Sequence, residues 1–198
     1  MGQGWHTVSS TDNRFTRWNN SAVGATAAAD FRNEPNTFGY IVEIDPMSAA
    51  APAKRVAMGR FAHEAAVFGK PVVGKPLAVY MGDDSRNEYI YKFVSAANWD
   101  DKDIGSGLAA GDKYLTEGKL YAAKFNADGT GQWLELNIAD AKVSGYTAYA
   151  FANQADVFVN ARHAADAVGA TKMDRPEWGS VNPANGEIYM TLTNNSSA

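Results

Sequence analysis

The stretch KLYAAKFNADGTGQWLEL, residues 119–136, decides the class of fold. Its two ends, Lys119–Phe125 and Gln132–Leu136, are runs of apolar and aromatic residues that suit β-strands. Between them, Asn126–Gly131 supplies one Asn, one Asp and two Gly, which are residues that tight turns require. This pattern predicts a β-hairpin. A similar pattern over residues 178–192, with turn residues at 182–186, predicts a second one.

Four further strands are predicted, each an apolar or alternating run bounded by turn residues: Phe38–Ile44, Val56–Phe61, Leu77–Met81 and Glu88–Val94. The acidic, glycine-rich segment 99–111 is predicted to be a loop. One helix is predicted over residues 153–168, because apolar residues recur on one helical face and Gly169 follows as a stop signal.

Short strands separated by turns, with little helix, predict a mainly β fold. Antiparallel hairpins of this kind suit part of a β-propeller-like fold, with one short helix near 153–168. No repeat at blade spacing supports the propeller, and the strands would make roughly two to three blades, where propellers have about four to eight. We expect a single incomplete domain over residues 1–198, with an irregular N-terminal segment at 1–30 and the propeller-like portion at 31–195.

Composition excludes several classes of protein. The chain has a net charge of -4 and no basic run, which argues against nucleic acid as its main partner. It has no cysteine, so disulfides and thiolate zinc sites are excluded within it. No apolar run reaches the roughly 18 residues that span a bilayer. Residues 1–10 lack the features of a signal peptide, and the chain stops straight after a strand-like run, so we expect an internal segment of a longer protein.

The stretch GATKMDRPEW, residues 169–178, places Asp174, Arg175 and Glu177 within four positions. Pro176 is expected to push Arg175 towards an extended conformation, so that Arg175 and Glu177 share a face. Such a group is often a surface ion pair. It also suits a metal-and-phosphate site, because carboxylates hold hard cations and arginine binds phosphate oxygens in pairs. These residues alone leave both interpretations open.

Other acidic residues stand at the ends of strand-like runs: Glu64, Asp83 with Asp84, and Glu88. Their oxygens suit Ca²⁺, Mg²⁺ or oxidised iron. Taken singly, each is more often a capped turn or a solvated charge. Together with Arg86 and Arg175 they suggest a site, provided that the fold brings them together.

Several familiar motifs are incomplete. His63 and Glu64 resemble part of a helical zinc signature, but Val67 stands where the second His would be, so a hydrogen-bonded structural role for His63 is favoured. The acidic loop at Asp100 fails the EF-hand template, with Gly105 at a ligand position. Neither a nucleophile elbow nor a P-loop is found, so serine hydrolase and NTPase functions have no support.

Five phrases, in chain order, resemble the PhoX-type alkaline phosphatases. They lie at residues 36–46, 59–64, 79–94, 170–178 and 181–195. The resemblance covers roughly residues 31–195. It implies a β-propeller-like fold, a periplasmic or extracellular location, and hydrolysis of small-molecule phosphate monoesters at a cluster of calcium and iron ions.

The resemblance also implies roles for individual residues. Glu64, Asp83 and Glu177 would be metal ligands, and Arg175 would grip the phosphate as a catalytic residue. Lower-ranked ligand or supporting roles fall to Glu34, His63, Asp84, Asp174, Arg86 and Glu88, with Arg86 and Glu88 expected to pair with each other. Hydrolysis of a phosphate monoester requires that negative charge on the transferring oxygens be neutralised, and metal ions held by these carboxylates together with Arg175 could do so.

Two departures from the family pattern matter. The family's cysteine iron ligand has no counterpart here, and Ala62 stands where the family often has lysine. We therefore expect an enzyme segment that carries part of the metal site and is inactive alone. Two alternatives stay open: a non-catalytic, calcium-stabilised propeller module, and a calcium-dependent propeller hydrolase of another ester. The oligomeric state is not predicted.

Overall fold

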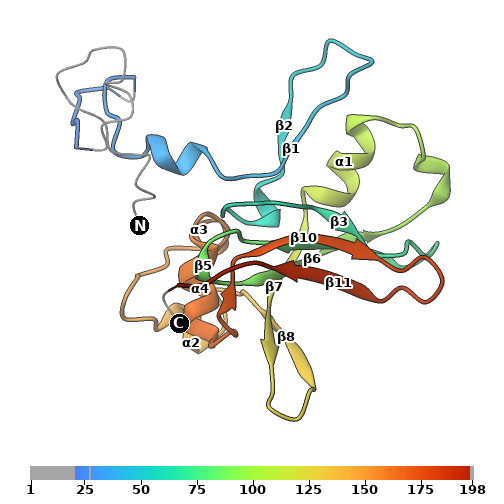
Figure 1. The fold of residues 1–198 in the computed structure, drawn as a ribbon. Coiled ribbons are helices and arrows are strands. Elements are labelled where there is room, and N and C mark those ends of the chain that lie inside the picture. Colours follow the sequence, from blue (N-terminus) through green and yellow to red (C-terminus); the bar gives the residue numbers. More distant parts are fainter. Residues whose placement is uncertain (1–20, 27, 197–198) are drawn as a thin grey trace. The chain divides into compact units, whose positions relative to one another are not determined.

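A computed structural model describes residues 21–26 and 28–196. The chain divides into two compact units, residues 1–39 and 40–198. The described part of the first unit contains the 3-10 helix η3, Glu34–Thr37, whose first turn holds Pro35 and whose Thr37 hydroxyl donates to the Glu34 carbonyl oxygen at 2.7 Å. It is drawn in blue (Figure 1).

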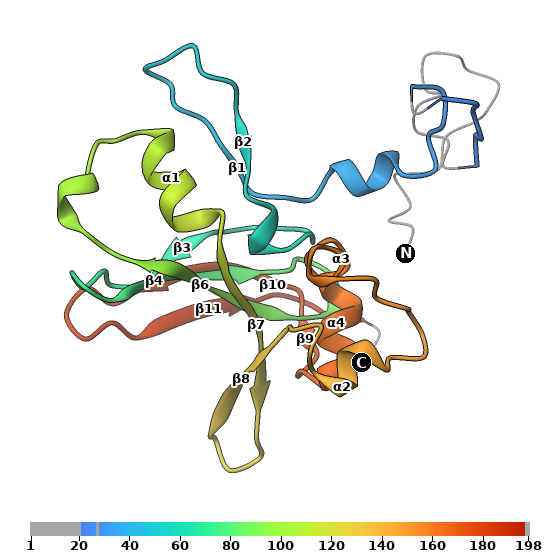
Figure 2. The same ribbon diagram turned by 180° about the vertical axis from the view of Figure 1, so that it is seen from behind.

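The second unit is built on a five-stranded antiparallel sheet in the order β3-β4-β6-β7-β8 (Figures 1 and 2). Its strands are β3 (Val67–Phe68), β4 (Pro76–Gly82), β6 (Ile90–Asn98), β7 (Gly118–Phe125) and β8 (Gly131–Glu135). Alternate residues of β4 and β6, such as Val79, Met81, Tyr91 and Phe93, are fully buried. This period of two defines the core face of the sheet.

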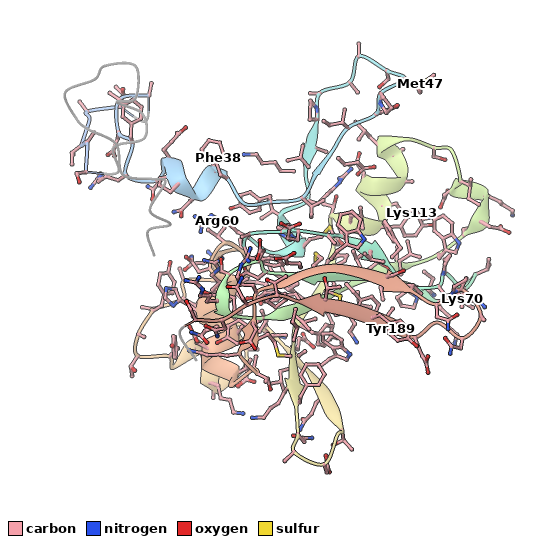
Figure 3. All side chains as sticks on the ribbon, in the orientation of Figure 1. Phe38, Met47, Arg60, Lys70, Lys113 and Tyr189 are labelled. Carbon is pink, nitrogen blue, oxygen red and sulfur yellow. The ribbon has the colours of Figure 1, made fainter. Side chains whose placement is uncertain are left out.

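Helices complete the core: η4 (Val56–Met58), α1 (Leu108–Leu115), α2 (Ala141–Ser144), α3 (Gln154–Val159) and α4 (Ala161–Val168). The 3-10 helix η5 (Asp101–Asp103) precedes α1 and has no buried residue. Helix α1 packs against β6, and η4 lies between α3 and β7. Figure 3 labels Met47, which is exposed in the segment 44–52, and Lys113 of α1, which pairs with Asp103 of η5 at 2.7 Å.

Three two-stranded sheets surround this core: β1 (Val42–Glu43) with β2 (Ala53–Lys54), β5 (Arg86–Glu88) with β9 (Met173–Asp174), and β10 (Pro176–Val181) with β11 (Ile188–Leu192). Strand β10 runs close to β4 and β3 (Figure 1). The approach is close because Gly82, at the end of β4, has no side chain: a Cβ there would lie 2.5 Å from the carbonyl oxygen of Pro176 and would also clash with that of Glu177.

The mainly β prediction and both hairpins are confirmed, with 30% strand against 21% helix. The described strands form no closed propeller or barrel, so the propeller stays a prediction. No helix among the described residues is long and apolar enough to cross a membrane.

Five local predictions are wrong. The helix at 153–168 is two helices, because Asn160 leaves helical geometry at φ -116° and ψ 44°. The loop predicted at 99–111 contains η5 and the start of α1, so the helix count of one is also wrong. The strand predicted at 56–61 is instead η4 over residues 56–58, which ends at Gly59 with φ 87°. Of the strand predicted at 38–44, only Val42–Glu43 is paired.

The close approach at Gly82 yields a first prediction. Gly82→Ala should lower the free energy of unfolding by about 1–3 kcal/mol, because the added methyl group meets backbone atoms rather than a movable side chain. Urea unfolding of the chain measures this. Gly69→Ala is the matched control, since the atom nearest to its Cβ would belong to the Tyr80 ring, at 3.2 Å, and the nearest backbone atom would be 3.5 Å away. Equal losses in both variants would contradict the packing at Gly82.

Candidate active site

Arg175 lies between β9 and β10 and has a left-handed backbone, with φ 51°. The predicted extended conformation is therefore wrong, although Arg175 and Glu177 do lie together. A positive φ costs a non-glycine residue about 1–3 kcal/mol and concentrates at functional sites. The side chain accounts for it here: Nη2 lies 2.8 Å from Asp84 Oδ1 and 3.3 Å from Glu177 Oε1, and Nη1 donates to the Thr193 hydroxyl at 3.1 Å.

Three carboxylates gather around this guanidinium, from Glu64, Asp84 and Glu177. Partial desolvation and then the negative charges of Asp84 and Glu177 raise the pKa of Glu64, while Arg175 acts in the opposite direction. Asp84 Oδ1 is buried and makes no well-directed hydrogen bond among the described residues, despite its ion-pair contact with Arg175. The group is thus crowded with negative charge and has acceptor capacity to spare.

Backbone pairing brings these residues together from distant parts of the chain. Residues 62–64 run antiparallel to residues 82–84, with Asp84 N–H donating to the Ala62 carbonyl oxygen at 2.9 Å and a bridge between His63 and Asp83. This register sets Glu64 opposite Gly82 and Ala62 opposite Asp84, so Glu64 and Asp84 lie on the same face of the pair. The close approach of β10 at Gly82 adds Glu177 from the other side.

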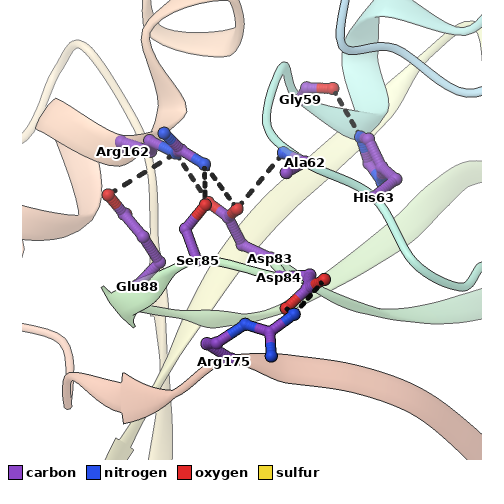
Figure 4. A network of polar contacts seen from close by, with 9 residues as sticks. All are labelled: Gly59, Ala62, His63, Asp83, Asp84, Ser85, Glu88, Arg162 and Arg175. Atoms are coloured by element: carbon purple, nitrogen blue, oxygen red, sulfur yellow. Dashed lines mark hydrogen bonds and ion pairs between the residues drawn. The ribbon is translucent and has the colours of Figure 1, made fainter. Parts of the chain in front are cut away.

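Asp83 points away from Arg175 and into the core, where it pairs with Arg162 of α4 (Figure 4). Its carboxylate is fully buried. Arg162 Nε donates to Oδ2 at 2.7 Å, Arg162 Nη2 donates to Oδ1 at 2.6 Å, and the Ala62 N–H donates to Oδ1 at 3.2 Å. Burial raises the pKa of Asp83, and the Arg162 guanidinium opposes that effect.

This geometry disfavours the metal-ligand role predicted for Asp83. Both oxygens already accept hydrogen bonds, solvent does not reach them, and a cation would stand beside the buried charge of Arg162. The expected pair of Arg86 with Glu88 is likewise replaced: Glu88 Oε1 lies 3.6 Å from Arg162 Nε. Burial, followed by the charge of Asp83, raises the pKa of Glu88 to about 8.

Sequence reasoning missed Arg162, which is 79 positions from Asp83. A signal was present, however. In the predicted helix, Arg162 follows Phe158 by four positions and precedes Ala165 by three, so it stands on the apolar face. A charged residue there is a buried charge in need of a partner.

His63 makes contacts that fit the structural role favoured by the residue pattern, and its role stays a prediction. Its ring stacks on Phe61 with centroids 3.7 Å apart, and Nε2 lies 3.1 Å from the Gly59 carbonyl oxygen (Figure 4). Desolvation lowers the pKa of His63 to about 4, so the neutral ring donates through Nε2. Nδ1 is buried without a hydrogen-bond partner among the described residues.

Because His63 is buried in its neutral form, we predict that the free energy of unfolding falls at acid pH. Because its pKa is lowered on folding from about 6.5 to about 4, the chain is stabilised above pH 6.5 and loses that stability as the pH falls through 4. The loss should be at most about 3 kcal/mol. Urea unfolding of the wild type and of His63→Gln between pH 7 and 4 measures it, and the variant should show a flatter fall. Identical pH profiles would contradict the burial of a neutral His63.

The remaining predicted site residues are Asp174, Arg86 and Glu34, and none of them is among the residues of the Arg175 group described above. Asp174 is exposed on β9, where its backbone pairs with that of Arg86, which is also exposed. Glu34 belongs to the first unit, so its ligand role stays a prediction. A mostly apolar cavity of about 400 Å³, lined by residues that include Phe68, Trp99 and Tyr114, involves none of the Arg175 group.

Calcium or iron, the metals that the resemblance implies, would suit the donor chemistry of Glu64, Asp84 and Glu177. All three offer carboxylate oxygens, Asp84 Oδ1 has acceptor capacity, and the like charges favour a cation. Even so, no group of three or more His, Cys, Asp or Glu side chains in the described residues is close enough to hold one ion. Ca²⁺ takes about 6–8 oxygens, so these side chains could supply only part of its shell.

Fold and site together define a mainly β protein with an arginine among carboxylates, a combination suited to phosphate and hard cations. The chain belongs to the alkaline phosphatase PhoX family, whose family model matches residues 3–198. It is also similar to a solved structure, Pseudomonas fluorescens PhoX in complex with vanadate, a transition state analogue. The two share 42% sequence identity and superpose with a TM-score of 0.75.

That similarity covers 86% of this chain and 30% of the Pseudomonas fluorescens chain. The comparison with curated proteins gives no match.

Proposed function

We propose that this chain supplies the phosphate-binding part of the active site of a phosphate monoester hydrolase. One observation carries the proposal: the left-handed Arg175, held by Asp84 and Glu177, in a chain 42% identical to a PhoX protein whose structure contains a transition state analogue. Since the chain matches 30% of that relative, we further propose that sequence outside it completes the site. The propeller-like whole and the periplasmic or extracellular location belong to the same proposal.

Arg175 would bind and orient the phosphate. Its guanidinium carries donors in a planar fork that matches two phosphate oxygens, and its side chain retains 31% exposure for a ligand to approach. Asp84, Glu177 and Thr193 hold the fork in place before substrate arrives. Such preorganised donors lower the free energy of the charged transition state more than mobile ones do.

Glu64, Asp84 and Glu177 would contribute oxygens to bound calcium or iron. When bound, these cations would neutralise charge on the phosphoryl oxygens and activate a hydroxyl nucleophile. The role of the chain's own carboxylates is to offer those oxygens on either side of the Arg175 fork. Asp83 is left out of this set because Arg162 occupies it.

A calcium-stabilised module without catalysis is the second candidate function, since the same carboxylates could tie loops together. Arg175 argues against it. A structural calcium site gains nothing from a guanidinium among its ligands, because the two positive charges repel. Nor does it require a backbone conformation as costly as that of Arg175.

The test is a hybrid enzyme, in which this chain replaces the matching segment of Pseudomonas fluorescens PhoX. Hydrolysis of an aryl phosphate with added Ca²⁺ is measured for the hybrid and for the 198-residue chain alone, with elemental analysis of both. We expect hydrolysis and bound metal in the hybrid and no hydrolysis by the chain alone. A folded hybrid that binds calcium without hydrolysing the ester would favour the structural module.

A further inference from the structure

The ion pair of Asp83 with Arg162 lies directly beside the Arg175 group, yet neither of its members faces that group. Arg162 is 10% exposed and contacts Asp83 and Ser85 of the turn after β4, with the Ser85 hydroxyl 3.0 Å from Nη2, and Glu88 of β5. Its donors are committed to the protein, so Arg162 is unsuited to bind substrate. Figure 4 shows the pair on one side of the turn and Arg175 on the other.

The turn between β4 and β5 carries both roles on adjacent residues. Asp83 points into the core, and Asp84, the next residue, points to Arg175. Neighbouring residues of an extended chain point to opposite faces, so fixing one side chain fixes the direction of the other. The turn is held further by Ser85 N–H donating to the Asp83 carbonyl oxygen at 2.7 Å and by Asp83 N–H donating to the Tyr89 carbonyl oxygen at 3.2 Å.

The backbone of Asp84 is held by its N–H bond to the Ala62 carbonyl oxygen, but its side chain has few constraints of its own. Its contact with Arg175 is an ion pair on a part-exposed side chain, and such pairs are weak and mobile when nothing else orders them. The paired, buried hydrogen bonds of Asp83 and Arg162 are much stronger constraints.

We propose that Arg162 is a positioning residue, which holds Asp83 in the core and thereby fixes Asp84 against Arg175. The inference rests on the proposed function for its catalytic consequence. Asp83 then serves as an anchor for the site rather than as a ligand in it. Helix α4, which carries Arg162, is thereby linked to the position of Arg175 through Asp83 and Asp84.

The test compares Arg162→Lys with Arg55→Lys. Arg55 is also a buried arginine, paired with Glu43 and Asp112, in a network that does not include the β4–β5 turn. Each substitution keeps the charge and removes the planar fork, so both should destabilise the fold in the same way. Only Arg162→Lys should change the site.

The first readout uses the 198-residue chain: the guanidinium Nε–H resonance of Arg175 in ¹⁵N-labelled protein, assigned by its loss in Arg175→Lys. We expect Arg162→Lys to shift it towards the position of a free arginine and Arg55→Lys to leave it in place. The second readout is orthovanadate inhibition of the hybrid enzyme. Inhibition should weaken by on the order of 10²-fold in Arg162→Lys and less than about twofold in Arg55→Lys.

The two readouts separate the two proposals. If both lysine variants, or neither, shift the Arg175 resonance, Arg162 is only structural and the inference is overturned, whatever the hybrid does. If the hybrid hydrolyses ester but vanadate inhibits both variants equally, the inference fails while the proposed function stands. If the wild-type hybrid is inactive, the proposed function fails, and the resonance alone decides the position of Asp84.

Discussion

Arg175→Ala is expected to reduce hydrolysis of an aryl phosphate by the hybrid enzyme about 10²- to 10³-fold, the loss typical of removing a preorganised donor to a transition-state oxygen. The reason is that Arg175 carries the fork of donors held between Asp84 and Glu177. Metal content should stay the same, because an arginine is not a metal ligand. Steady-state kinetics with elemental analysis of the same preparations measures both quantities.

Arg32→Ala is the matched control for this variant. Arg32 is an exposed arginine that pairs with Asp30, so it represents the plain surface ion pair that the sequence could not distinguish from a phosphate site. Its loss should change the rate by less than about twofold. Equal rates for Arg175→Ala and the wild type would show that Arg175 does not bind the phosphate and would favour a plain surface ion pair.

Asp83→Ala is expected to lower the free energy of unfolding of the 198-residue chain by about 3–5 kcal/mol. It leaves Arg162 as a buried charge whose main partner is gone. Much of that loss should return in the double variant Asp83→Leu with Arg162→Met, because apolar residues of similar size can replace a buried ion pair. Urea unfolding followed by circular dichroism measures all three proteins.

Lys119→Ala provides the contrasting case. Lys119 pairs with Glu135 at 3.0 Å on the surface, with 61% of its side chain exposed. Its removal should cost less than about 1 kcal/mol. If Asp83→Ala lowers the free energy of unfolding no more than Lys119→Ala does, the pair of Asp83 with Arg162 is not buried as the structure has it. That result would also contradict the positioning role of Arg162.

The hairpins could be predicted from sequence because their determinants are local. Asn, Asp and Gly between apolar runs fix the turn at 126–131, and each strand pairs with its neighbour. The pairing of Arg175 with Glu177 is also local, although the extended backbone from which it was predicted is wrong. The backbone of Arg175 was not predictable in this way, because its conformation is held by Asp84, 91 positions away.

Helix α1 was missed for a related reason. Gly111 stands inside it and reads as a helix breaker. In the fold, the missing side chain is what admits the ion pair of Arg55 with Glu43, since a Cβ at that position would clash with both. The requirement comes from residues more than fifty positions upstream, and no local pattern reports it.

The metal site could be predicted only in part. Glu64, Asp84 and Glu177 meet because residues 62–64 pair with residues 82–84 and β10 approaches Gly82, which are contacts across the whole unit. Asp83 and Asp84 are indistinguishable in sequence, and both end the same strand. The alternation of side chains, together with the distant Arg162, decides which of the two faces the site.

The most direct test of the proposed site is a crystal structure of the hybrid enzyme grown with orthovanadate and Ca²⁺. We predict that the Arg175 guanidinium donates to vanadate oxygens at about 3 Å. Glu64, Asp84 and Glu177 should face bound metal ions, while Asp83 stays paired with Arg162. Vanadate bound elsewhere, with Arg175 still paired only to Asp84 and Glu177, would contradict the phosphate-binding role proposed for this chain.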